Sequence, residues 1–128
     1  MAILNSTVVN GNLNVTGTVS AAGYSTVSDK RIKQNVQEFV PEASILDLPV
    51  YTYDYIGETT PKNQVGCIAQ ELQELFPQLV REESNGILTV QEAKLVYPLL
   101  IEVKRQREEL EVLKKKLEQL ESKFDRLD

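Results

Sequence analysis

The last third of the chain carries an unbroken heptad pattern. Apolar or amide residues recur there at alternating spacings of three and four, which is the a/d pattern of a coiled coil. The predicted helix starts near Gln91 and, at 1.5 Å per residue, would extend roughly 55 Å, beyond any globule that a chain of this length can form. We therefore expect its distal half to pack against copies of itself. The seam comprises Val96, Leu99, Val103, Gln106, Leu110, Leu113, Leu117, Leu120, Phe124 and Leu127.

The charges beside this seam favour a parallel arrangement. With Leu110 at position a and Leu113 at position d, all four pairs between a g position and the next e position of a parallel neighbour have opposite sign. Each exposed pair contributes only about 0–1 kcal/mol, but a shifted or antiparallel register would bring like charges together. Leucine at both a and d does not select a dimer. The pairs are Glu102–Arg107, Glu109–Lys114, Lys116–Glu121 and Lys123–Asp128.

Residues 1–27 contain no acidic or basic side chain and are rich in Val, Thr, Asn, Ser and Gly. Apolar residues partly alternate and are interrupted by Asn10-Gly11 and Gly17, a pattern typical of short strands joined by turns. A segment with so little apolar surface cannot form its own core. It would be stable only if it paired with other chains or packed on the following domain. We interpret it as a β-stalk segment at the end of a larger fibrous protein, an interpretation that favours three chains.

Residues 28–90 carry the signals of a small globular α+β unit. Ile45 and Leu48 are expected to face inward from a short helix, and three alternating tyrosines predict a strand. Asn85-Gly86 should supply the two positive φ angles of a tight hairpin turn. A second helix should bury Leu72, Leu75 and Phe76 and end at Pro77. The elements are a helix within 41–50, a strand at 50–56 with Tyr51, Tyr53 and Tyr55, a strand and helix within 64–80, and a hairpin at 81–90.

The predicted fold class is therefore α+β. A β-stalk segment (1–27) precedes the globular unit (28–90), and a long helix (91–128) forms a parallel trimeric coiled coil.

Composition excludes several kinds of function. The net charge of −5 gives no general basic field for nucleic acid, and no run of residues is apolar enough to span a membrane. The absence of histidine removes Ser-His and Cys-His catalysis, and the single cysteine, Cys67, excludes a multi-thiolate zinc site. We expect no metal, no cofactor and no nucleic-acid or membrane partner.

One polar stretch, "STVSDKRIKQN" at 25–35, contains a candidate reactive centre. A serine hydroxyl becomes nucleophilic when a base takes its proton, and Ser28 and Lys33 could form such a pair. The lysine must be neutral, which requires its ordinary pKa of about 10.4 to be lowered by burial or by cations such as Lys30 and Arg31. In a helix the two side chains would lie about 140° apart, and in a strand on opposite faces. The pairing requires a turn or a lysine from another chain; otherwise Ser28 caps a short segment and Lys33 is solvated.

The order of motifs resembles a known family. "SDKRIKQNV" (28–36), a Y-x-Y strand (51–53), "VGCIAQELQELFPQLV" (65–80), a glycine turn before "LTV" (88–90) and a leucine-rich terminal helix are similar to the C-terminal intramolecular chaperone domain, or S74 peptidase domain, of phage tail spikes, endosialidases and neck appendage proteins. The resemblance covers about residues 28–125. Many relatives have Val-Asp-Tyr where this chain has Val90-Gln91-Glu92, a departure that bears on local packing.

The resemblance implies a homotrimeric assembly factor that brings three fibre or spike chains into register and then cuts itself off, in a bacteriophage protein made in the host cytoplasm as a virion tail or appendage precursor. Ser28 matches the nucleophile and Lys33 the general base, while Asp29 and Arg31 have positioning roles. Gly66, Gln70 and Glu71 match the second motif, as part of the supporting fold.

The alternative is a permanent trimeric cap or adhesion tip without proteolysis. Several points stay open: the parent fibre and its receptor, whether a nucleotide or ion assists release, and whether Lys33 acts within its own chain. Ring size favours cutting at Val27–Ser28, because attack by the Ser28 hydroxyl on the Val27 carbonyl passes through a five-membered ring. The runner-up is Ser28–Asp29.

Overall fold

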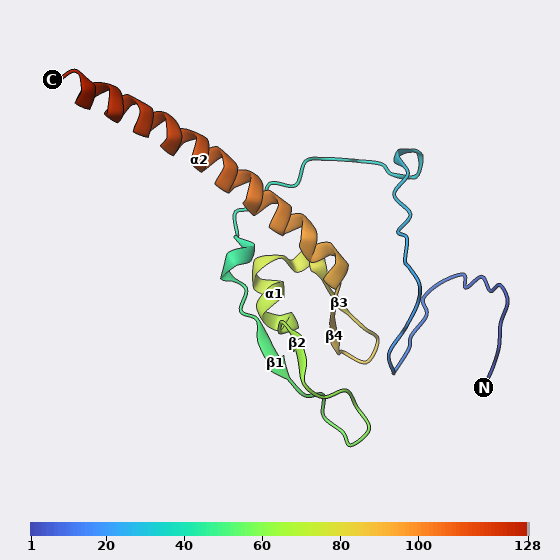
Figure 1. Cartoon of the computed structure of the whole chain (residues 1–128). Coiled ribbons are helices and arrows are strands. Elements are labelled where there is room, and N and C mark those ends of the chain that lie inside the picture. Colours follow the sequence, from blue (N-terminus) through green and yellow to red (C-terminus); the bar gives the residue numbers. More distant parts are fainter. Residues whose placement is uncertain (128) are drawn as a thin grey trace.

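The computed structural model describes residues 1–127. Figure 1 shows an extended N-terminal segment, a small packed unit and a long helix that projects from this unit. Every residue from Met1 to Val40 is exposed in the single chain, and the packed unit begins at Pro41. The elements, in order, are the 3₁₀ turns η1 (Lys30–Ile32) and η2 (Ile45–Asp47), strands β1 (Tyr51–Tyr53) and β2 (Gln64–Gly66), helix α1 (Ala69–Leu75), turn η3 (Pro77–Leu79), strands β3 (Val80–Glu82) and β4 (Leu88–Val90), turn η4 (Glu92–Leu95) and helix α2 (Val96–Asp125).

The packed unit combines two antiparallel strand pairs with α1. Strand β1 pairs with β2, so that Tyr51 lies opposite Gly66, and β3 pairs with β4, so that Val80 lies opposite Val90. The core consists of Leu72, Phe76 and Leu79, with exposed fractions of 0%, 1% and 9%. The α+β class is thereby confirmed. Half-buried apolar side chains from several elements pack around the core: Ala43, Ile45, Leu48, Cys67, Leu75, Val80, Val90 and Leu95.

Helix α1 forms where the sequence predicts it, because Leu72 and Phe76 lie four residues apart and share one face. The helix ends at Leu75, and Pro77 opens the 3₁₀ turn η3 instead of continuing the helix. The helix expected within 41–50 is shorter than predicted. It is a single 3₁₀ turn, η2, which the Ser44 side chain caps by accepting from Leu46 N.

The hairpin turn differs from the prediction in its backbone. Gly86 has a positive φ of 82°, whereas Asn85 does not have a positive φ. Gly86 N donates to Glu83 O, and the Asn85 side chain accepts from Ile87 N. The loop is therefore one residue longer than a two-residue turn, so that only the glycine needs the left-handed conformation.

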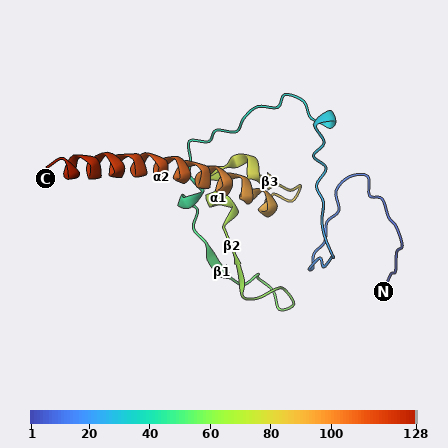
Figure 2. The same cartoon turned by 45° about the horizontal axis from the view of Figure 1, so that its top comes forward.

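The strands expected in residues 1–27 are not formed in the single chain. No residue of this range belongs to a strand, and all are exposed. The physical reason is that a strand needs a partner for its backbone hydrogen bonds, and within the described residues no backbone hydrogen bond joins residues 1–27 to another strand or to the packed unit. Figure 2 shows this segment separated from the packed unit in a second view.

Helix α2 begins at Val96, later than predicted, because η4 occupies residues 92–95. Its 30 residues correspond to a length of about 45 Å. Pro98, Ile101, Glu102 and Arg105 are buried or half-buried near the packed unit. Beyond them, the apolar seam residues are about half to four-fifths exposed in the single chain, from Leu117 at 56% to Leu127 at 82%.

One predicted flanking charge has a different partner. Glu102, assigned to an exposed g position, is 7% exposed and pairs with Arg105 of its own chain at 3.0 Å. The proximal helix is docked on η2, so this g position faces the chain's own domain. Only the distal pairs are therefore free to set the register between chains, and Lys123–Asp128 includes a residue outside the described residues.

Truncating the core should destabilise the unit strongly. Replacing Leu72 by alanine should lower the free energy of unfolding by about 2–5 kcal/mol, because a fully buried side chain leaves a cavity. Leu46→Ala is the matched control: Leu46 is 63% exposed, so its loss should cost less than about 0.5 kcal/mol. Urea unfolding at one protein concentration compares the two, and equal losses would contradict this core assignment.

Candidate active site

A 3₁₀ turn shapes the stretch that contains the candidate reactive residues. Asp29, in an extended conformation, is the N-cap of η1, and its Oδ1 accepts from Arg31 N at 2.9 Å. Ile32 N donates to Asp29 O and Lys33 N to Lys30 O, both at 3.2 Å. An aspartate is a preferred N-cap because its side-chain oxygen satisfies an N–H that lacks a partner within the turn. The cap is thus Asp29, and the alternative that gave this role to Ser28 is wrong.

The turn brings Ser28 and Lys33 together. The Lys33 ammonium donates to the Ser28 hydroxyl, with Nζ and Oγ 2.6 Å apart. Neither a continuous helix nor a continuous strand could make this contact, as the sequence indicates. The contact forms because η1 is a single turn between two residues with extended backbones, Asp29 and Lys33. The contact forms within one chain. The catalytic roles of the two residues stay predictions.

Asp29 and Arg31 form a second pair on the same turn. Arg31 donates from Nε to Oδ1 at 3.1 Å and from Nη2 to Oδ2 at 2.8 Å. The hydrogen bond from the Arg31 side chain lowers the pKa of Asp29, and the same bond raises the pKa of Arg31. The cap therefore stays ionised near neutral pH and keeps its position. This geometry agrees with the positioning roles predicted for both residues.

The reactive turn stands apart from the packed unit. Ser28, Lys33 and every residue around them are exposed, and Figure 1 shows η1 at the outer end of a long connection to the packed unit. Asn35, two residues after Lys33, has a positive φ of 55°, which redirects the chain after the turn. Lys30 and Arg31 are the cations on the turn.

The residues of the second motif support the fold, away from the reactive turn. A side chain at Gly66 would approach the Tyr53 ring to 3.2 Å, so glycine allows this ring to cover β2. Glu71 accepts from the Tyr51 hydroxyl at 2.9 Å, and this hydrogen bond raises the pKa of Tyr51. Gln70 is exposed. The Tyr51–Glu71 bond joins β1 to α1, a link for which the sequence offers no short-range signal.

Within residues 1–127 we also looked for a reactive thiol, a metal site and a membrane-spanning helix. Burial raises the pKa of the Cys67 thiol, which disfavours the reactive thiolate. In this part of the chain no three metal-binding side chains of the His, Cys, Asp or Glu type come together. Among these residues no helix is both long and apolar enough to cross a membrane.

Comparison with protein families relates part of this chain to a chaperone domain. Residues 28–81 match the family model Peptidase_S74, chaperone of endosialidase. This match confirms the resemblance drawn from the motifs. The matched range starts at Ser28 and includes the turn, β1, β2 and α1. It supports an intramolecular chaperone role, a self-cleaving activity of the serine-peptidase type and a phage origin.

The Asp29–Arg31 pair should titrate only in acid. The pKa of the Asp29 carboxyl is lowered in the folded chain, so the pair stabilises the turn fully at pH values above the ordinary pKa of 3.8. This stabilisation is lost as the pH falls through the lower pKa of the folded chain. Carbon-13 NMR titration of the Asp29 carboxyl should give a midpoint below 3.8, and Arg31→Ala should move it back toward 3.8. An identical midpoint in both proteins would contradict the pairing.

Proposed function

We propose that this chain is an intramolecular chaperone that trimerises a phage fibre or spike and then releases itself by Ser-Lys autoproteolysis. The observation that carries the proposal is the 2.6 Å contact between Lys33 Nζ and Ser28 Oγ, placed at the start of the segment that matches the chaperone family. Ser28 is the nucleophile and Lys33 the general base. Asp29 and Arg31 hold the turn on which both lie.

The reaction needs no group beyond these side chains and water. Neutral Lys33 takes the Ser28 proton as Oγ bonds to the Val27 carbonyl carbon. The C–N bond to Ser28 then breaks, and the Lys33 ammonium returns the proton to the departing nitrogen. Water hydrolyses the resulting ester, leaving a carboxylate on Val27 and restoring the Ser28 hydroxyl beside a new amino terminus.

Ring size selects the scissile bond. Attack by Ser28 on the preceding carbonyl closes a five-membered ring, whereas attack on its own carbonyl would need a strained four-membered ring. Val27–Ser28 is therefore the proposed bond. Cutting at Ser28–Asp29 would require a serine or water from elsewhere.

Assembly of three chains would give Lys33 the surroundings that favour its neutral form. Desolvation and nearby cations favour the neutral form of a lysine, yet Ser28 and Lys33 are both exposed in the single chain. The exposed seam of α2 supports association of three chains, since Leu110, Leu113 and Leu117 are 66%, 59% and 56% exposed on one stripe. We propose that the trimer covers the turn, so that cleavage follows assembly. Once cut, the stalk cannot readily unfold by the reverse path, which makes its stability kinetic.

A permanent trimeric cap or adhesion tip is the second candidate. The same seam favours it, because association needs no cleavage. The two functions differ in covalent structure after folding.

Cleavage should depend on both members of the pair. Ser28→Ala should abolish it, and Lys33→Ala should slow it by about 10²–10⁴-fold, the usual contribution of a general base. Lys33→Arg should be equally impaired, since an arginine keeps the charge but cannot deprotonate. Ser25→Ala is the matched control, an exposed serine on the same stretch, and should cleave like the wild type.

Mass spectrometry of the N-terminal fragment provides the measurement. A fragment of residues 1–27 identifies Val27–Ser28, and one of residues 1–28 identifies the runner-up. Intact full-length mass for the wild type after folding would refute autoproteolysis and leave the permanent cap.

Charge exchange should test the parallel coil. Glu109→Lys places like charges opposite Lys114 of a neighbour and should lower the melting temperature of the trimer, whereas adding Lys114→Glu should restore it. The effect is about 0–1 kcal/mol per pair and acts at all three interfaces. Sedimentation equilibrium should give the mass of three chains for the wild type. Failure of the second substitution to restore the first would overturn the parallel register.

A further inference from the structure

The segment that carries Ser28 and Lys33 is held to the packed unit at Pro41. Arg105 Nη2 donates to the Pro41 carbonyl oxygen at 2.5 Å, across 64 positions of sequence. Within residues 1–127, this is the one hydrogen bond that joins residues 1–41 to the rest of the chain. Phe39 adds an apolar contact, its ring centroid 6.4 Å from that of Phe76.

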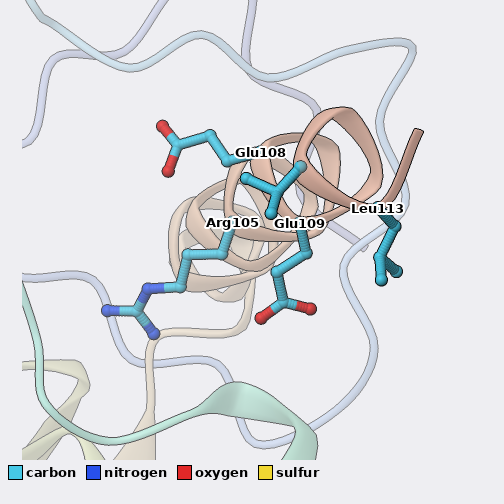
Figure 3. Close-up of a pocket in the computed structure, with 5 residues that line it drawn as sticks. Arg105, Glu108, Glu109 and Leu113 are labelled. Atoms are coloured by element: carbon cyan, nitrogen blue, oxygen red, sulfur yellow. The ribbon is translucent and has the colours of Figure 1, made fainter. Parts of the chain in front are cut away.

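Arg105 is itself held in place by a buried carboxylate. Its Nη1 donates to Glu102 Oε1 at 3.0 Å, and the Glu102 side chain is only 10% exposed. The planar guanidinium can bind a carboxylate with one nitrogen and a carbonyl with another, a geometry that the single ammonium of a lysine does not reproduce. Figure 3 shows Arg105 and Leu113 projecting from different sides of α2. The side that holds Pro41 is thus distinct from the side that carries the seam.

We propose that Glu102 and Arg105 are positioning residues that tie the reactive segment to α2. Both lie on the proximal part of the same helix whose distal seam is proposed to assemble, so the clamp would fix where the turn can reach relative to that assembly. This inference rests on the proposed function. Neither residue touches the reacting atoms; they act through Pro41 and the connection that leads to Lys33.

The length of the connection between Lys33 and Pro41 determines how much loss of the clamp should slow cleavage. Lys33 and Pro41 are eight positions apart, so the connection spans at most about 26–29 Å when fully extended. Without the clamp, the connection could lengthen by at most four residues, up to η2 at Ile45, and only if the contacts of Phe39 and Ala43 with the core were lost as well. The effective concentration of a tethered group falls roughly as the −3/2 power of tether length, which gives at most about a two-fold loss here.

The direct test is Arg105→Lys in the full chain. It keeps a cation beside buried Glu102, avoiding the uncompensated charge that Arg105→Ala would leave. The first-order cleavage rate should fall by up to about two-fold from the longer tether alone, and by up to about a hundred-fold where placement of the turn is lost. Trimer mass and melting temperature should stay close to wild type. Lys104→Ala is the control: an exposed residue next to Arg105 on α2, which should cleave at the wild-type rate.

A second variant separates tethering from a purely structural role. Inserting four Gly/Ser residues between Gln37 and Glu38 lengthens the connection by the same amount and leaves the clamp intact. It should slow cleavage by a comparable factor without changing the melting temperature. Wild-type rates in either the insertion or Arg105→Lys would overturn the inference, whereas absence of cleavage in the wild type itself would instead overturn the proposed function.

Discussion

Three buried side chains, Leu72, Phe76 and Leu79, hold the packed unit together, and their small number constrains everything else. A core of this size stabilises one short helix, two strand pairs and the first turns of α2. It cannot cover the rest of α2 or order the first 40 residues, all of which are exposed in the single chain. Among the apolar side chains left exposed, those from Leu110 to Leu127 form one continuous seam along the helix, which further copies could bury in the proposed trimer. Burial of this seam is what would stabilise the proposed trimer.

The turn that carries Ser28 and Lys33 does not depend on this core, because local hydrogen bonds determine its shape. The Asp29 cap and the Asp29–Arg31 pair hold η1, and η1 sets Lys33 against Ser28 without help from the core. These local bonds place the proposed nucleophile and base together in the single chain, where both are exposed. Under the proposed function, cleavage would begin only when assembly supplies surroundings that favour a neutral lysine. The Glu102–Arg105 clamp on Pro41 would link the two parts.

The spacing of apolar residues predicted those elements of the fold that depend on a local sequence pattern. The helix with Leu72 and Phe76 and the long heptad helix were readable because one face of each is apolar at regular spacing. The strands predicted for residues 1–27 are not formed in the single chain, since alternation does not supply a partner strand. The turn chemistry at Asn85 was wrong, because a positive φ is demanded only at Gly86.

The site was less accessible to sequence reasoning. Ser28 and Lys33 could be nominated, yet their contact depends on a 3₁₀ turn whose cap is Asp29, and spacing alone argued against it. Glu102 appeared as a surface charge of the coil, whereas it is buried against its own domain. Its bond to Arg105 and the reach to Pro41 cross 64 positions, a separation at which one sequence gives no signal.

The dependence of cleavage on protein concentration tests the central claim most directly. Freshly folded chain would be diluted across the range in which native mass spectrometry resolves monomer from trimer, and the rate of appearance of fragment 1–27 would be measured at each concentration. If assembly activates Lys33, cleavage per chain should rise with the trimer fraction and become negligible in monomer. A cleavage rate per chain that stays constant down to fully monomeric protein would contradict it.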